Sequence, residues 1–179
     1  MKSICVYCGS ATGTSPLYAD QARALASVLV NHNMQLIYGG GDVGLMGILA
    51  NEVMRLGGEV TGVIPQLLLE KEVEHRGLTR LHIVKDMHER KAMMANLSDA
   101  FIALPGGIGT LEELFEVLTW HQIGFHKKPV GLLNGNGFYD GLLGFLDHLV
   151  TEGFLKSEHR ALLHVANDPT ELLTRLMTA

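Results

Sequence analysis

A glycine-rich turn that ends in two glutamates, PGGIGTLEE at 105–113, lies between an apolar run typical of a strand and an apolar run typical of a helix. Gly106, Gly107 and Gly109 allow backbone N–H groups to approach a bulky ligand, and Thr110 adds a hydroxyl. The start of a helix attracts anions through its free N–H groups and its dipole. The dipole contributes up to about 2 kcal/mol in favourable geometry. We therefore expect this turn to bind a phosphate group.

Glu112 and Glu113 place negative charge directly beside this expected anion site. Consecutive helix residues point about 100° apart, so the two carboxylates cannot share one role. Thr110-x-x-Glu113 matches a capping box, which on its own is the stronger interpretation of Glu113. The alternative is that one glutamate holds a ligand while the other does chemistry or caps the helix.

The segment MHERK at 87–91 contains another candidate pair, Arg90 and Lys91, just after an apolar strand pattern. Asp86 and Arg90 have the i, i+4 spacing of a helical ion pair worth about 0.2–0.5 kcal/mol. Asp86-x-x-Glu89 could also cap the helix. An arginine fork, however, suits the recognition of phosphate or carboxylate groups. The spacing alone leaves both interpretations of Arg90 open.

Two further glycine-rich turns follow strand patterns, CGSATG at 8–13 and GGGDVGLMG at 39–47. Gly39, Gly41 and Gly44 have the G-x-G-x-x-G spacing of a dinucleotide-binding turn, and Glu59 has roughly the separation of its ribose-binding acid. Glu59 begins the next strand, however, whereas that acid should follow the strand. Tight packing between helix and strand is the simpler interpretation, and NAD(P) binding is the minor alternative.

Strand and helix patterns alternate along the whole chain, which indicates an α/β fold: a Rossmann-like, doubly wound parallel sheet with helices on both faces. We expect one domain, 1–179. Because parallel sheets bind ligands at the carboxyl ends of their strands, the three glycine-rich turns should face one crevice. Ser15 is expected to cap the first helix, with Pro16 at its first position. Strands are expected within 3–9, 35–41, 59–65, 80–86, 100–105, 129–134 and 161–167, helices within 15–33, 43–58, 87–99, 110–124 and 137–154 and from 168 on, and an irregular stretch at 66–79.

The net charge of −5 gives no basic footprint for nucleic acid, and no apolar run approaches the length of a membrane span. We expect a cytoplasmic protein with no nucleic acid or membrane partner. Cys5 and Cys8 have C-x-x-C spacing but fall in an apolar strand pattern, so we expect them to be buried and structural. No His-rich ligand spacing is present, and no metal site is predicted.

Together, PGGIGTLEE and MHERK resemble the Lonely Guy (LOG) family, whose signature is P-G-G-x-G-T-x-x-E with an upstream Arg-Lys pair. The similarity extends to ICVYCGS, GGGDVGLMG, GVIP and KPVGLLN, and so covers nearly the whole chain. Ile108 stands where many members have tyrosine, and Ala11 stands where many have a second serine after CGS. Older labels describe such sequences as lysine decarboxylases, but no pyridoxal site can be recognised.

The resemblance implies an enzyme that hydrolyses the N-glycosidic bond of nucleoside 5′-monophosphates, either cytokinin ribotides, AMP or both. It implies no cofactor, a homodimer whose active site draws on both subunits, and catalytic roles for Glu113 and Arg90. The expected substrate contacts are Gly106, Gly107, Gly109, Thr110, Glu112, Lys91, Glu72, Thr119, Ser10, Gly40 and Gly41.

A carboxylate beside a phosphate site has a physical rationale in this reaction. Breaking a ribosyl–base bond develops positive charge on the sugar, as in glycoside hydrolysis. Glu113 would stabilise that charge and orient or deprotonate water, while Arg90 would fix the substrate and assist departure of the base. The competing hypotheses are a non-catalytic nucleotide or cofactor carrier of the same fold and a nicotinamide-dependent oxidoreductase.

Overall fold

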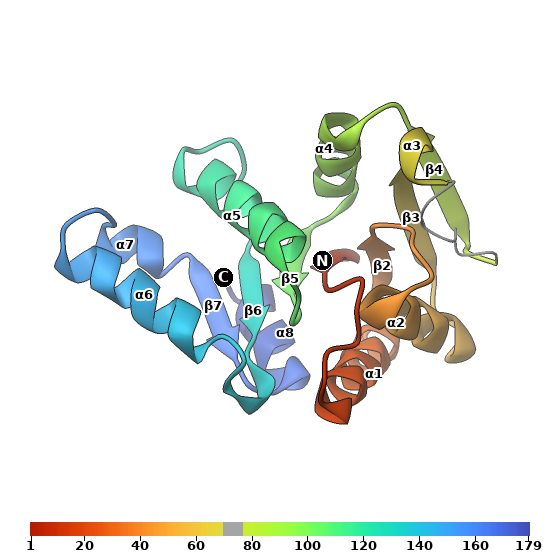
Figure 1. Ribbon diagram of the computed structural model, residues 1–179, viewed down its shortest axis with the longest axis horizontal. Helices are drawn as coiled ribbons and strands as arrows, with labels where there is room; N and C mark the ends of the chain where they lie inside the picture. The colour runs from red at the N-terminus through yellow and green to blue at the C-terminus, as the bar shows by residue number, and fades with distance from the viewer. Residues whose placement is uncertain (70–76) are drawn as a thin grey trace.

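The computed structural model describes residues 1–69 and 77–179, and all the strands found there form one parallel seven-stranded sheet. The strand order is β4-β3-β2-β1-β5-β6-β7, with the N-terminal strand at the centre (Figure 1). The strands are β1 (Ser3–Tyr7), β2 (Gln35–Tyr38), β3 (Val60–Pro65), β4 (Arg80–Val84), β5 (Ala100–Ala103), β6 (Val130–Leu133) and β7 (Leu163–Ala166).

Helices cover both faces of this sheet, which confirms the predicted doubly wound α/β class. The helices are α1 (Pro16–Asn31), α2 (Gly44–Arg55), α3 (Gln66–Leu69), α4 (Met87–Leu97), α5 (Ile108–Gln122), α6 (Asp140–Thr151), α7 (Ser157–Arg160) and α8 (Pro169–Met177), with the 3-10 turn η1 (Gly135–Gly137). In Figure 1, α4 and α5 lie above the sheet and α1, α2 and α8 lie below it. Helix α6, at the left beside β7, packs on the same core as α4 and α5.

The two faces have separate hydrophobic cores. One core joins α1, α2 and α8 to the sheet through residues such as Leu25, Leu49 and Leu172, and the other joins α4, α5 and α6 through Met94 and Leu114. Strands β1, β5 and β6 are buried along their whole length, as expected for the centre of a covered parallel sheet. Both cores therefore hold the carboxyl ends of the central strands in fixed positions.

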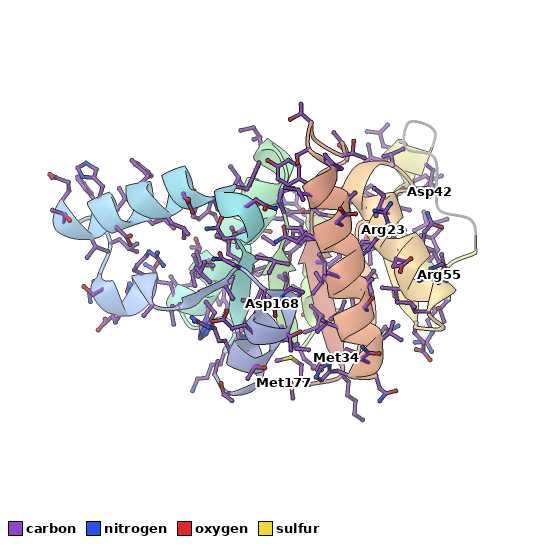
Figure 2. The ribbon with its side chains drawn as sticks, turned by 90° about the horizontal axis from the view of Figure 1, so that it is seen from below. Arg23, Met34, Asp42, Arg55, Asp168 and Met177 are labelled. Carbon is purple, nitrogen blue, oxygen red and sulfur yellow. The ribbon has the colours of Figure 1, made fainter. Side chains whose placement is uncertain are left out.

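The N-terminal ends of α1 and α8, on the face below the sheet in Figure 1, agree with the helix starts predicted from the sequence. The Ser15 hydroxyl accepts a hydrogen bond from the Leu17 N–H, and Pro16 opens α1, as predicted. The Asp168 carboxylate accepts from the N–H groups of Thr170 and Glu171 at the start of α8. Figure 2 shows this face with Asp168 beside α1.

The outer surface of α1 and α2 carries ion pairs between residues about one helical turn apart. Arg23 pairs with Asp20 on α1, and Arg55 pairs with Glu52 on α2. Figure 2 shows Arg23 and Arg55 on these two neighbouring helices. Exposed pairs of this kind contribute about 0–1 kcal/mol to stability.

Two elements were not predicted. The short helix α3 lies in the stretch 66–79 that was expected to be irregular, and α7 lies before β7. Cys5 and Cys8 are free and buried, and their predicted burial is confirmed. Within the described residues, no helix is both long and apolar enough to cross a membrane.

Candidate functional site

The three glycine-rich turns meet at the carboxyl ends of β1, β2 and β5, as predicted. The Gly9 N–H donates to the Pro105 carbonyl (3.0 Å), and the Gly9 carbonyl accepts from the Leu45 N–H (3.0 Å). Gly44 has φ +60°, and a Cβ there would lie 2.2 Å from the Ser10 carbonyl carbon, so this approach requires glycine. The chain reverses its strand order between β1 and β5, which is where such sheets form a ligand crevice.

Helix α5 begins earlier than predicted, at Ile108, with Gly107 as its N-cap and no side chain capping it. Thr110 is therefore inside the first turn and buried, and the predicted capping box of Thr110 and Glu113 is wrong. Gly106 is confined, because a Cβ would lie 2.1 Å from the Thr110 Oγ1. The first N–H groups of a helix have no partner within it, so those at the entrance of α5 are available to an anion.

A cavity of about 290 Å³ opens beside this helix start. Both predicted catalytic residues, Glu113 and Arg90, line it. The full lining is Cys8, Gly9, Ser10, Met46, Met87, Arg90, Gly107, Ile108, Gly109, Thr110, Glu112 and Glu113. The cavity thus combines backbone donors, one guanidinium and two carboxylates.

The Glu113 carboxyl group is partly buried and has a pKa raised from 4.5 to about 7. Burial is the largest cause, because it disfavours the charged form. Arg90 and Lys91 lower the pKa, while Glu112 and Glu116 raise it. A carboxyl group with a pKa near neutrality can hold or release a proton at physiological pH, which suits acid–base chemistry.

Arg90 is only 7% exposed and is held by backbone carbonyl groups. Its Nε donates to the Val63 carbonyl (3.1 Å) and its Nη2 to the Gly39 carbonyl (2.9 Å), while Nη1 lies 3.6 Å from the Met87 sulfur. Sulfur is a weak acceptor, so Nη1 is the part of the guanidinium with the least protein hydrogen bonding among the described residues. Arg90 is therefore fixed at the ends of β2 and β3 with one edge available to a ligand.

The alternative ion pair between Asp86 and Arg90 does not form. The Asp86 carboxylate instead caps α4 by accepting from the Glu89 N–H (2.9 Å), and the Glu89 carboxylate accepts from the Lys85 N–H (2.7 Å). Capping by Asp86 was the other structural possibility in the sequence. Since Asp86 is used at the helix start, Arg90 turns toward the sheet.

Lys91 points to α5 rather than into the cavity. Its Nζ forms ion pairs with Glu112 (2.6 Å) and Glu116 (3.0 Å). Glu112 is on the cavity wall, so Lys91 reaches the cavity only through that carboxylate.

The other predicted substrate contacts do not all line the cavity. Ser10 lines the cavity, whereas Gly40 packs against Ile64 with φ +80°, and neither Gly40 nor Gly41 is part of the cavity lining. Thr119 is exposed on α5 and also lies outside this lining. Glu72 falls outside the described residues.

Sequence reasoning missed several residues that line the cavity or make room for the residues that do. Gly39 was considered only as part of a dinucleotide motif, but a Cβ there would lie 2.1 Å from Arg90 Nη2, so its glycine makes room for the guanidinium. Met46, Met87 and Cys8 form apolar walls. In the sequence, these three residues are indicated as cavity residues only by their position within a few residues of a motif glycine or of Arg90.

A second cavity of about 290 Å³ shares Gly9, Ser10 and Gly107 with the first. Its far wall includes Tyr18 and Phe138, whose rings meet edge to face with centroids 5.5 Å apart. Within the described residues, no group of three His, Cys, Asp or Glu side chains is arranged to hold a metal ion.

Sequence similarity to known proteins extends over nearly the whole chain. Residues 46–176 match a family model described as "possible lysine decarboxylase". The cytokinin riboside 5′-monophosphate phosphoribohydrolase LOG of Oryza sativa subsp. japonica is 51% identical over 175 residues, which cover 98% of this chain and 72% of that protein. The corresponding LOG5 of Arabidopsis thaliana is 49% identical, covering 98% and 77%.

Among solved structures, the molybdenum cofactor carrier protein of Chlamydomonas reinhardtii is similar with a TM-score of 0.75. The match covers 99% of each chain at 22% sequence identity. At this level of identity the likeness shows the shared fold.

Proposed function

Because the chain belongs to the Lonely Guy family of cytokinin riboside 5′-monophosphate phosphoribohydrolases, we propose that it hydrolyses the N-glycosidic bond of nucleoside 5′-monophosphates. The products are the free base and ribose 5-phosphate, and the substrates are AMP, cytokinin ribotides or both. One observation carries the proposal: Glu113 and Arg90 line the same cavity, at the entrance of a helix whose first N–H groups are available.

The phosphate is proposed to bind at the start of α5. Gly107 and Gly109 have open space where a Cβ would be, so a ligand can approach their backbone closely. Ser10, from the turn after β1, adds a hydroxyl at the same cavity. This arrangement supports an anchor for the 5′-phosphate, with the sugar extending toward the next turn of α5.

Glu113 is proposed to act on the ribose. As the bond between C1′ and the base nitrogen breaks, its electron pair leaves with the base and positive charge develops on the sugar. An ionised carboxylate about 4 Å from that charge contributes on the order of 4 kcal/mol at an effective dielectric of 20, or about a thousandfold in rate. Glu113 then accepts a proton from the water that forms the new bond to C1′.

Arg90 is proposed to hydrogen-bond to the substrate and stabilise the electron-rich leaving base. Guanidinium groups do not lose their proton in proteins, so Arg90 acts as a fixed donor and not as an acid. Its two hydrogen bonds to the Val63 and Gly39 carbonyls support this role, because they hold the group in place before the substrate binds.

The family description as a lysine decarboxylase does not fit the cavity. Pyridoxal chemistry requires a lysine that forms a Schiff base. None of the described residues that line the two cavities is lysine, and Lys91 is held by Glu112 and Glu116.

We further propose a homodimer with a shared active site, located in the cytoplasm. Large apolar side chains on and after α5 support an association surface, since Ile108 is 82% and Phe125 76% exposed. Sedimentation analysis tests the assembly: a dimer is expected, and a monomer at micromolar concentration would contradict it.

The activity is tested by incubating the protein with a panel of nucleoside monophosphates and separating the products by chromatography, with the matching nucleosides as controls. We expect free base and ribose 5-phosphate from the nucleotides and much slower cleavage of the nucleosides. Equal rates for both would contradict the phosphate anchor. Saturable binding without base release would instead support the carrier hypothesis, and NAD(P)-dependent thermal stabilisation would support the oxidoreductase.

A further inference from the structure

An ion-pair cluster joins the two helices that carry the proposed catalytic residues. Lys91 of α4 lies between Glu112 (2.6 Å) and Glu116 (3.0 Å) of α5. The Lys91 side chain is 11% exposed, that of Glu116 24% and that of Glu112 51%. The cluster is therefore more sheltered from solvent than the surface pairs on the other helices.

The cluster adjoins both proposed catalytic residues in sequence. Lys91 directly follows Arg90, and Glu112 directly precedes Glu113. Figure 1 shows α4 and α5 as two separate helices on the same face of the sheet. Both helices are stiff over this length, so a link between Lys91 and α5 constrains the distance between Arg90 and Glu113.

Glu112 and Glu116 differ in one respect that matters for a test. Glu112 lines the cavity, whereas Glu116 lies outside its lining. A change at Glu112 can therefore act directly on a ligand. The Glu116 carboxylate accepts a hydrogen bond from the ammonium of Lys91 (3.0 Å), so its effect on the position of Arg90 passes through that residue.

We propose that Glu116 is a positioning residue: by holding Lys91 against α5, its carboxylate sets the placement of Arg90 relative to Glu113. This inference rests on the proposed nucleotide hydrolysis and deepens it. The phosphate grip at the start of α5 does not depend on Glu116, so the loss of this residue should affect turnover more than binding.

The charges around Glu113 give a second, independent readout. Among the described residues, the titratable or charged groups that interact with it come from three elements. They are Arg90 and Lys91 of α4, Glu112 and Glu116 of α5, and Cys5, Tyr7 and Cys8 of β1 and its following turn. Glu116 raises the pKa of Glu113. Replacing Glu116 with glutamine therefore lowers that pKa and moves the acid limb of the pH–rate profile to lower pH.

The test measures kcat, KM and the pH profile for E116Q, K91M and the double variant, with E171Q as the matched control. Glu171 forms a helical ion pair with Arg175 on α8, away from the cavity. We expect kcat of E116Q to fall about tenfold, which corresponds to about 1.4 kcal/mol, while KM changes less than about twofold and E171Q behaves as the native protein. Because Glu116 positions Arg90 through Lys91, the kcat of the double variant, measured above the acid limb of the pH profile, should be no lower than that of K91M.

Two results would overturn the proposal: E116Q with native kcat, whether or not the acid limb shifts, or a full additional loss of kcat when E116Q is combined with K91M. Failure of the proposed function is separable, since the native protein would then release no base. In that case the interaction between Glu116 and Lys91 is tested by measuring the pKa of the Lys91 ammonium, using NMR of protein labelled with carbon-13 at lysine. Burial lowers this pKa, but the hydrogen bonds to Glu112 and Glu116 outweigh burial, so E116Q must lower it if Glu116 holds Lys91.

Discussion

The activity of the protein should rise steeply between pH 6 and pH 8. Burial of Glu113 holds its pKa near 7, and the proposed chemistry uses the ionised carboxylate. With that pKa, about one tenth of the molecules are ionised at pH 6 and about nine tenths at pH 8. We therefore expect kcat/KM to increase about eight- to tenfold over this range and then to level off.

The assay is the initial rate of adenine release from AMP across pH 5.5–8.5, analysed as kcat/KM, which reports the free enzyme. The substrate phosphate also titrates near pH 6, so the decisive comparison is with E112Q. Glu112 raises the pKa of Glu113, and its replacement must move the limb to lower pH while the substrate's own titration stays fixed. A limb near pH 4.5, or one that E112Q leaves unmoved, would refute this reasoning.

Three further outcomes follow from the same contacts. Because burial raises the pKa of Glu113 from 4.5 to about 7 in the folded protein, stability is lost as the pH rises from about 4.5 to 7 and stays lost at higher pH. E113Q removes this loss and should be more stable than the native protein by up to about 3 kcal/mol at pH 8 and by little below pH 4, as measured by urea unfolding. G39A places a Cβ 2.1 Å from Arg90 Nη2, and should cost about 1–3 kcal/mol and lower kcat/KM; unchanged kinetics would show that Arg90 need not be fixed. R90K replaces the planar guanidinium, whose Nε and Nη2 donate to the Val63 and Gly39 carbonyls, with a single ammonium that has no separate edge for the ligand. We expect at least about a tenfold loss of kcat/KM; full activity would mean that the charge alone suffices.

Most of the fold could be predicted from the sequence because its signals are local. Uninterrupted apolar strands alternate with amphipathic helices. Ser15 and Asp168 mark helix starts because their side chains accept hydrogen bonds from the first turn, and Pro16 fits the first position of α1. The short helices α3 and α7 were missed because four residues are too few to show a helical period.

The candidate site was less accessible to the same reasoning. The prediction of a capping box failed because α5 starts at Ile108, so Thr110 already lies in its first turn. The orientation of Arg90 depends on carbonyl groups of β2 and β3, which are distant in sequence. Glycine spacing could not indicate that Gly39 makes room for this arginine, because the cause is a tertiary contact.

The most direct test of the account is the turnover of AMP by E113Q, with nucleotide binding measured in parallel. Glutamine keeps the size of Glu113 and removes its charge, so we expect base release to fall by about a hundredfold or more while AMP still binds. A variant that releases adenine at the native rate would contradict the assignment of Glu113 as the group that stabilises the cationic ribose.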